Sequence, residues 1–190
     1  MNDAARADTA LLLMDLQSGI LASYGDADYL PRIRRALAAA RHAGLPVIWV
    51  RVAFRDGYPE VSADNAIFAG IRGSGRLLES TAAAGIHPDL AVQPQDVIVT
   101  KRRISAFAGS DLDVVLRGGQ IRHLVLAGVS TSGVVLSTVR LAADLDYRLT
   151  VLADGCMDAD AEVHRVLTEK VFPRQATVRT IDDWAASLAA

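Results

Sequence analysis

Cysteine is almost absent from this sequence of 190 residues, in which Cys156 is the single one. One thiol per chain excludes an internal disulfide framework and a cysteine-rich zinc site, and it fits a reducing compartment. The four histidines are scattered without the spacing of a ligand pair, and no phosphate-binding Gly-x-x-x-x-Gly-Lys motif is present. We therefore expect a cytoplasmic protein that uses no metal and no cofactor.

Long apolar runs and runs of basic residues are missing as well. No segment approaches the roughly 18 consecutive apolar residues of a membrane span, and residues 1–8 lack the pattern of a secretory signal. The 20 basic and 22 acidic residues give a net charge of −2, and runs of Lys and Arg such as nucleic-acid-binding proteins carry are absent. We therefore expect a small-molecule substrate, and neither a nucleic-acid nor a membrane partner.

The residues that are present favour one ordinary globular domain. Hydrophobic residues make up 51% of the chain and charged residues 22%, a balance that excludes global disorder. Since a domain contains roughly 150 residues, the length predicts a single domain over residues 1–190. We expect residues 1–8 to form a flexible N-terminus.

Six short apolar runs predict strands that are buried on both faces of a parallel sheet. Stretches of helical periodicity separate them, which predicts an α/β doubly wound fold of three layers. Gly44 should end the first long helix in a left-handed conformation. The expected strands are 9–14, 47–53, 97–100, 124–129, 150–153 and 177–180, and the expected helices are 29–43, 111–117, 131–144, 159–171 and 181–188.

Residues 54–95 form the least regular part of the chain, with five of the 14 glycines and three of the six prolines. We interpret this segment as a long crossover with short helices. A connection of this length in a compact domain usually covers a binding site. We therefore predict that it serves as a lid.

Polar residues follow three of the predicted strands. Asp15 follows the first strand, Lys101 the third, and a run of small polar residues beginning at Ser130 follows the fourth. Ligands of open α/β sheets bind at the carboxyl ends of the strands, so these residues are expected to meet in one crevice. Taken singly, each also has an ordinary explanation as a turn residue, a surface charge or a helix cap.

Three longer segments carry a resemblance to a known family: LLLMDLQ, then HPDL followed by DVIVTKRRISAFAGSDLDVVLR, then LVLAGVSTSGVVLSTVRLAADLDYRLTVLADGC. In this order they resemble the isochorismatase-like hydrolases, also called cysteine hydrolases, over residues 9–181. The resemblance implies a six-stranded sheet of order 3-2-1-4-5-6 and a homo-oligomer, either a dimer or a tetramer. It also implies an Asp, Lys and Cys triad that acts on amides or on the vinyl ether of isochorismate. Asp15 and Lys101 match the first two members.

The third member of that triad has no match. The family pattern resembles Gly-Val-x-Thr-x-x-Cys-Val, whereas residues 128–135 read GVSTSGVV, which puts Val134 at the nucleophile position. Valine cannot attack a carbonyl group. The resemblance also implies a cis peptide bond between Val129 and Ser130, which directs backbone N–H groups at the substrate. Together with Gln17 and Gly133, these two are our candidate substrate-binding residues.

Three hypotheses follow from Val134. The first is a hydrolase that needs no cysteine nucleophile, as in cleavage of the isochorismate vinyl ether. The second is a catalytically silent member that binds a metabolite or a protein partner. The third is an amide hydrolase with a different nucleophile, for which Cys156 is the candidate, although an apolar setting usually makes a free cysteine inert. Ser130 and Ser132 fit helix capping better than a nucleophile elbow.

The first hypothesis assigns definite roles. Hydrolysis of a vinyl ether requires a proton at the enol carbon and water at the resulting oxocarbenium ion. Asp15 is the predicted general acid, and Lys101 orients it and holds the substrate carboxylate. Burial should raise the pKa of Asp15 while the lysine lowers it, so burial must dominate. Arg55 or Arg72 in the lid is a further candidate for pairing with a carboxylate.

Overall fold

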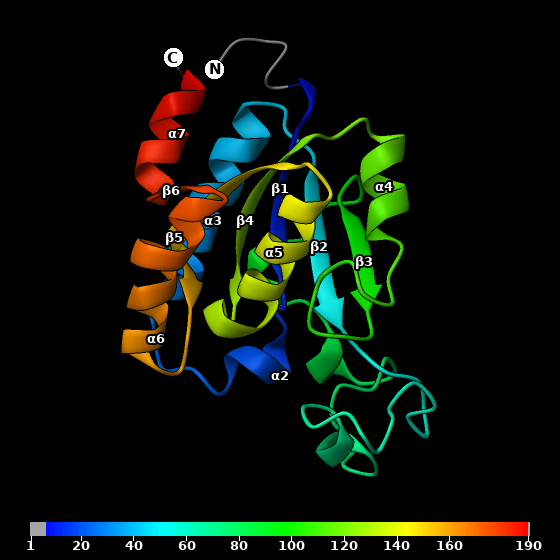
Figure 1. Cartoon of the computed structure of the whole chain (residues 1–190). Coiled ribbons are helices and arrows are strands. Elements are labelled where there is room, and N and C mark those ends of the chain that lie inside the picture. Colours follow the sequence, from blue (N-terminus) through cyan, green and yellow to red (C-terminus); the bar gives the residue numbers. More distant parts are fainter. Residues whose placement is uncertain (1–6, 190) are drawn as a thin grey trace.

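The computed structural model describes residues 7–189, which form one twisted sheet covered by helices on both faces (Figure 1). All strands are parallel and lie in the order β3-β2-β1-β4-β5-β6, so the predicted topology is confirmed. The strands are β1 (Thr9–Met14), β2 (Val47–Val52), β3 (Val97–Lys101), β4 (His123–Val129), β5 (Arg148–Met157) and β6 (Thr177–Arg179).

Burial explains why the apolar runs identified the sheet. All six residues of the central strand β1 are buried, as are six of the seven residues of β4. A strand that is covered on both faces has no need of polar alternation, so its sequence is a continuous apolar run. Only β6, at the edge of the sheet, lacks a buried residue.

The helices divide into two layers, each with its own apolar core. Figure 1 shows α4, α5 and α6 in front of the sheet and α3 behind it. Side chains of α4 and α5 join one cluster, and side chains of α3 and α7 join the other. The helices are α2 (Ser18–Leu21), α3 (Tyr29–His42), α4 (Leu112–Gly118), α5 (Leu136–Asp144), α6 (Ala161–Val166) and α7 (Ile181–Ala189). None of the helices described is both long and apolar enough to span a membrane.

The end of α3 agrees with the prediction for Gly44. This glycine adopts a left-handed backbone with φ +70°. The N–H of Leu45 then donates to the carbonyl of Ala40 at 2.9 Å. This is the pattern of a helix end closed by glycine, and it directs the chain into β2.

The segment 54–95 has the predicted character of a crossover with short helices. Three 3₁₀ turns occur in it, at Ala69–Ile71, Ala82–Ala84 and Pro88–Leu90. Its first half packs around a small apolar cluster of its own, in which the rings of Phe54 and Phe68 are 5.3 Å apart. Figure 1 shows the segment beyond the carboxyl ends of β2 and β3.

Several boundaries differ from the predictions. Two predicted helices contain π-helical turns, at Thr131–Val135 before α5 and at Leu167–Val171 after α6. Strand β5 continues to Met157 instead of ending at residue 153, because it passes a register irregularity opposite Leu126 and Gly128. The helix α2 was not predicted, since four residues are too few to show a period.

Residues 1–6 of the predicted flexible N-terminus lie outside the described residues. Asp8, by contrast, is held firmly against the sheet. Its carboxylate accepts two hydrogen bonds of 2.6 Å from Arg148, and its carbonyl accepts from the N–H groups of Arg122 and His123. The backbone of Asp8 thus continues the hydrogen bonding of β1.

Candidate active site

Asp15 and Lys101 form a buried ion pair at the carboxyl edge of the sheet. The Lys101 ammonium lies 2.9 Å from Oδ2 of Asp15 and donates a second bond of 2.9 Å to the carbonyl of Arg103. The two residues are 5% and 1% exposed. They come from the ends of β1 and β3, on either side of β2, so the predicted convergence of these strand ends is observed.

The backbone of Asp15 is unusual. It is left-handed, with φ 59°, and its N–H donates to the carbonyl of Val50 at 2.8 Å. Aspartate is one of the few non-glycine residues that tolerate this conformation. The turn ends the strand abruptly, and the carboxylate lies on the side of Lys101.

Burial dominates the electrostatics of Asp15. Loss of solvent raises the pKa of this carboxyl group, and the attraction and hydrogen bond of Lys101 lower it only in part. The net shift is therefore in the direction that general acid catalysis requires. Oδ1 of Asp15 is buried and has no hydrogen-bond partner among the described residues. An unpaired buried oxygen is costly, and it is the atom on which a proton is best accommodated.

The side chain of Gln17, a candidate for substrate contact, forms hydrogen bonds within the protein. Its side chain is completely buried, and its amide nitrogen donates to the carbonyls of Val52 and Ala84, both at 2.9 Å. Its amide oxygen accepts from the N–H of Val52 at 2.8 Å. The side chain thus fastens β2 and the crossover segment to the turn after Asp15. Because it has no exposed surface, the geometry does not favour a contact with substrate.

The turn after β4 lies directly beside this pair. Gly128 is paired with Met14, and a methyl group in place of its hydrogen would come within 2.5 Å of the Met14 carbonyl oxygen. Glycine is thus required where the two strands approach closely. The next peptide bond, between Val129 and Ser130, is cis, as the resemblance implied.

A π-helical turn follows the cis bond. The carbonyl of Ser130 accepts hydrogen bonds from the N–H groups of Gly133 and Val135, both at 3.2 Å. The N–H of Ser132 donates instead to Oδ2 of Asp158, at 2.7 Å. A Cβ at Gly133 would lie 2.6 Å from the Ser130 hydroxyl oxygen, so a side chain there would require this hydroxyl to move. A carboxylate from the next strand end thus helps to hold the turn.

Val134 and Cys156 both belong to the apolar core in front of the sheet. Val134 is 2% exposed and Cys156 is 4% exposed. Burial raises the pKa of the Cys156 thiol to about 12. A reactive cysteine needs the opposite environment, an electropositive and partly exposed one. The structure therefore supports a packing role for Cys156.

Charged residues tie the crossover segment to the end of β3. Arg102 forms ion pairs with Glu60 and Glu79, and Arg103 donates to the carbonyl of Glu60 at 2.9 Å. Arg55, a candidate for binding a substrate carboxylate, pairs with Glu60 at 2.5 Å. Its guanidinium is thus already engaged. Arg72, the other candidate, is exposed on the segment.

A polar group at the end of β5 was missed at the sequence level. Asp158 accepts from Ser132, as described above, and the His164 ring lies 2.9 Å from the Thr131 hydroxyl. Burial, followed by the Asp158 charge, raises the pKa of Tyr24, although its hydrogen bond with Ser130 opposes this shift. The acidic residues that follow residue 157 could have indicated this group. They were not considered as residues at a strand end, because β5 was predicted to end at residue 153.

The sequence is similar to known proteins over most of its length. The model of the isochorismatase domain matches residues 9–183. The isochorismatase family protein YecD of Escherichia coli O157:H7 is 31% identical, over 92% of this chain and 93% of the relative. The ureidoacrylate amidohydrolase RutB of Stutzerimonas stutzeri is 32% identical, over 95% of this chain and 80% of the relative.

The fold also matches a solved structure. A cysteine hydrolase from Pseudomonas syringae pv. phaseolicola superimposes with a TM-score of 0.89, over the whole of this chain and 94% of that one. Its sequence is 24% identical, so the likeness extends to the fold alone.

Proposed function

Because the chain belongs to the isochorismatase family of hydrolases, we propose that it hydrolyses a small molecule by general acid catalysis, without a cysteine nucleophile. The acid is Asp15. The specific reaction we favour is cleavage of a vinyl ether of the isochorismate type. Among the relatives are amidohydrolases, so the family itself does not decide between amide and ether substrates.

The observation that carries this proposal is the state of the Asp15 carboxyl group. It is buried, its pKa is raised by that burial, and Oδ1 lacks a partner among the described residues. A carboxyl group of this kind holds its proton at higher pH than an exposed one does, and it can deliver the proton to a substrate atom beside Oδ1.

The chemistry balances without a covalent intermediate. Asp15 gives its proton to the terminal enol carbon, and the positive charge moves to the ether carbon as an oxocarbenium ion. Water adds to that carbon and returns a proton to Asp15. The resulting hemiketal breaks its C–O bond to give a ketone and an alcohol. No step of this reaction requires a thiol, which fits the presence of valine at the position that the resemblance assigns to cysteine.

Lys101 supplies the electrostatic part of the mechanism. Two of its three ammonium protons point at Oδ2 of Asp15 and at the carbonyl of Arg103. These contacts hold Oδ2 in place and leave Oδ1 as the oxygen without a partner among the described residues. When Asp15 has given up its proton, the neighbouring ammonium stabilises the carboxylate that remains. Lys101 therefore orients Asp15 and also offers its third proton to a substrate carboxylate.

Replacement of Asp15 by asparagine tests the proposal. Asp15→Asn keeps the shape of the side chain and removes the transferable proton, so turnover of isochorismate should fall by about 10²–10⁴-fold. The measurement is release of the ketone product by purified protein. Asp64→Asn, an exposed change of the same kind in the crossover segment, should leave the rate unchanged. An unchanged rate in Asp15→Asn would refute the assignment.

A second candidate function is a silent member that only binds. The observation in its favour is the closure of the site, because Asp15, Lys101 and Val134 are each at most 5% exposed. Val134→Cys separates the two candidates when wild type and variant are assayed with isochorismate and with ureidoacrylate. Turnover by the variant alone would identify a lapsed enzyme. Ether cleavage by the wild type supports the main proposal, and amide cleavage by the wild type supports a different nucleophile.

A further inference from the structure

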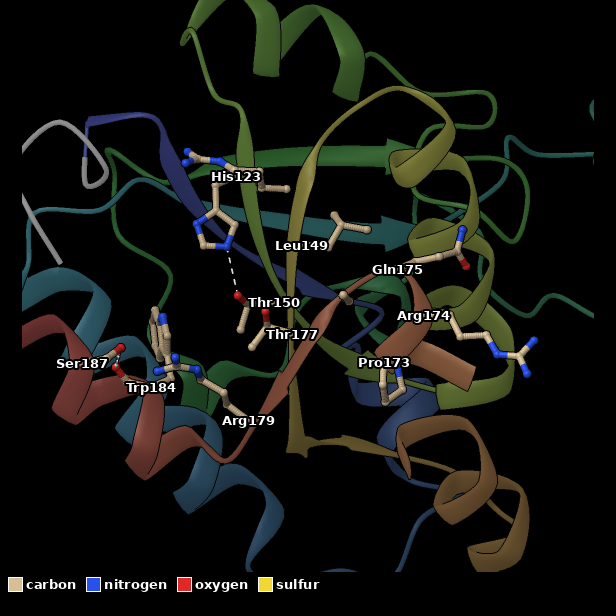
Figure 2. Close-up of a pocket in the computed structure, with 12 residues that line it drawn as sticks. His123, Leu149, Thr150, Pro173, Arg174, Gln175, Thr177, Arg179, Trp184 and Ser187 are labelled. Carbon is tan, nitrogen blue, oxygen red and sulfur yellow. Dashed lines mark hydrogen bonds between the residues drawn. The ribbon is translucent and has the colours of Figure 1, made fainter. Parts of the chain in front are cut away.

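A large cavity lies at the opposite edge of the sheet from Asp15 and Lys101. It has a volume of about 810 Å³, within the size range of small-molecule sites. Figure 2 shows it beside β6, where the first residues of β4 and β5 meet the start of β6 and one side of α7. Neither the resemblance nor the proposed function makes any use of this place.

Strand periodicity gathers polar side chains on one wall of the cavity. His123 is paired with Arg148, Thr150 with Thr177, and Arg179 with Leu152. Side chains two residues apart on a strand share a face. These five polar residues therefore lie on the sheet face that carries Leu152, and α7 covers the same face with Trp184.

The cavity is electropositive. Three arginines line it, namely Arg148, Arg174 and Arg179, whereas none of its lining residues is acidic. Arg148 pairs with Asp8, but Arg179 forms no ion pair with any residue that the structure describes. Burial, followed by Arg148, lowers the pKa of His123, so the positive charge near neutral pH comes from the guanidinium groups.

Hydrogen-bonding groups lie between the cations. The ring of His123 is held by the hydroxyls of Thr9 and Thr150, at 3.1 and 3.0 Å, which fixes its orientation. Figure 2 shows the side chain of Arg179 running toward Trp184, on the same side of β6 as His123 and Thr150. Arg174 lies on the other side of the strand and points away from Trp184.

We propose that this cavity is a second ligand site, in which Arg179 binds the carboxylate or phosphate group of a small molecule. A guanidinium forms paired hydrogen bonds with either group, which is the shared chemistry of the two ligand classes. The site goes beyond the proposed function and lies at the far edge of the sheet. A ligand there would join β6 and α7 to β5.

Titration of the full chain with inorganic phosphate and, separately, with succinate tests the proposal by calorimetry. We expect saturable binding of at least one probe with one site per chain, and the probe that binds identifies the ligand class. Arg179→Gln should weaken this binding at least tenfold. Arg174→Gln is the matched control, since it removes the same charge at the same cavity, and it should change the affinity by less than twofold.

Two outcomes would overturn the site. One is the absence of saturable binding for both probes. The other is equal weakening by Arg174→Gln and Arg179→Gln, which would mean that only net charge is sensed. Both arginines are exposed, and circular dichroism of each variant checks the fold. Arg179→Lys keeps the charge without the planar fork, so it should restore part of the affinity.

Discussion

The ion pairs at the two edges of the sheet differ in their exposure to solvent. At the carboxyl edge, Asp15 and Lys101 are withdrawn from solvent and paired with each other. At the amino edge, Arg148 and Asp8 form an ion pair whose side chains are 56% and 26% exposed, beside a cavity lined by further cations. The same type of interaction is thus buried at one edge and hydrated at the other.

The difference shows where the fold accepts an energetic cost. Removing a carboxylate and an ammonium from water costs several kcal/mol for each ion, and their attraction repays this only with good geometry. A hydrated pair costs little and contributes little. A buried pair with one unpaired oxygen is therefore poor as a stabilising device, and it is typical of a site kept for chemistry.

The largest effect should come from breaking each pair in turn. Lys101→Met removes the partner of the buried Asp15 carboxyl group and should lower the free energy of unfolding by about 3–5 kcal/mol at a pH at which that group is ionised. Arg148→Met breaks the exposed pair and should lower it by no more than about 1 kcal/mol. Urea denaturation measures both. Equal losses in the two variants would erase the contrast between the edges.

A smaller effect should appear in the pH dependence of stability. The pKa of Asp15 is raised in the folded protein above its ordinary value of 3.8. At a pH between 3.8 and the raised pKa of the folded state, the folded state binds more protons than the unfolded state. This residue therefore makes the protein less stable as pH rises. The contribution is fully present below 3.8 and is lost as pH passes the folded pKa.

The Asp15→Asn variant isolates this contribution from that of other carboxyl groups. Asp158 and Glu60 have lowered pKa values, which act on stability in the opposite direction. The free energy of unfolding of each protein is measured by urea denaturation from pH 3 to 8. Subtracting the Asp15→Asn values from the wild-type values removes the contributions of Asp158 and Glu60. A difference that rises with pH would contradict a raised pKa for Asp15.

The smallest effect concerns Cys156. At neutral pH a thiol of pKa about 12 has about a thousandfold less thiolate than one of pKa 9.0. The native protein should therefore react with iodoacetamide at a negligible rate, and urea should release the full reactivity. Rapid labelling of the folded protein, prevented by a bound substrate, would revive Cys156 as a nucleophile.

Burial determined how much of this molecule the sequence could predict. The central strands could be predicted from apolar runs, and the positions of Asp15 and Lys101 from the polar residues that follow those runs. The left-handed backbone of Asp15 could not, since tertiary hydrogen bonding imposes it. The end of β5 was predicted too early, because Asp154 and Gly155 resemble a turn, whereas the strand continues through them to Met157. The three hydrogen bonds of the Gln17 side chain could not be predicted, because Val52 and Ala84 lie on segments distant in sequence.

The hydrogen bonds of the Gln17 side chain restrict how the crossover segment can move. At one end, the crossover segment is bound to the Asp15 turn by Ala84 and by backbone bonds at Gly85 and His87. Toward its other end, Glu60 holds it to Arg102, which also pairs with Glu79 nearer to Ala84. A segment fastened at both ends cannot swing on a single hinge. Under the proposed function, a lid movement of this segment would therefore be a deformation of the span between the anchors and not a hinged swing.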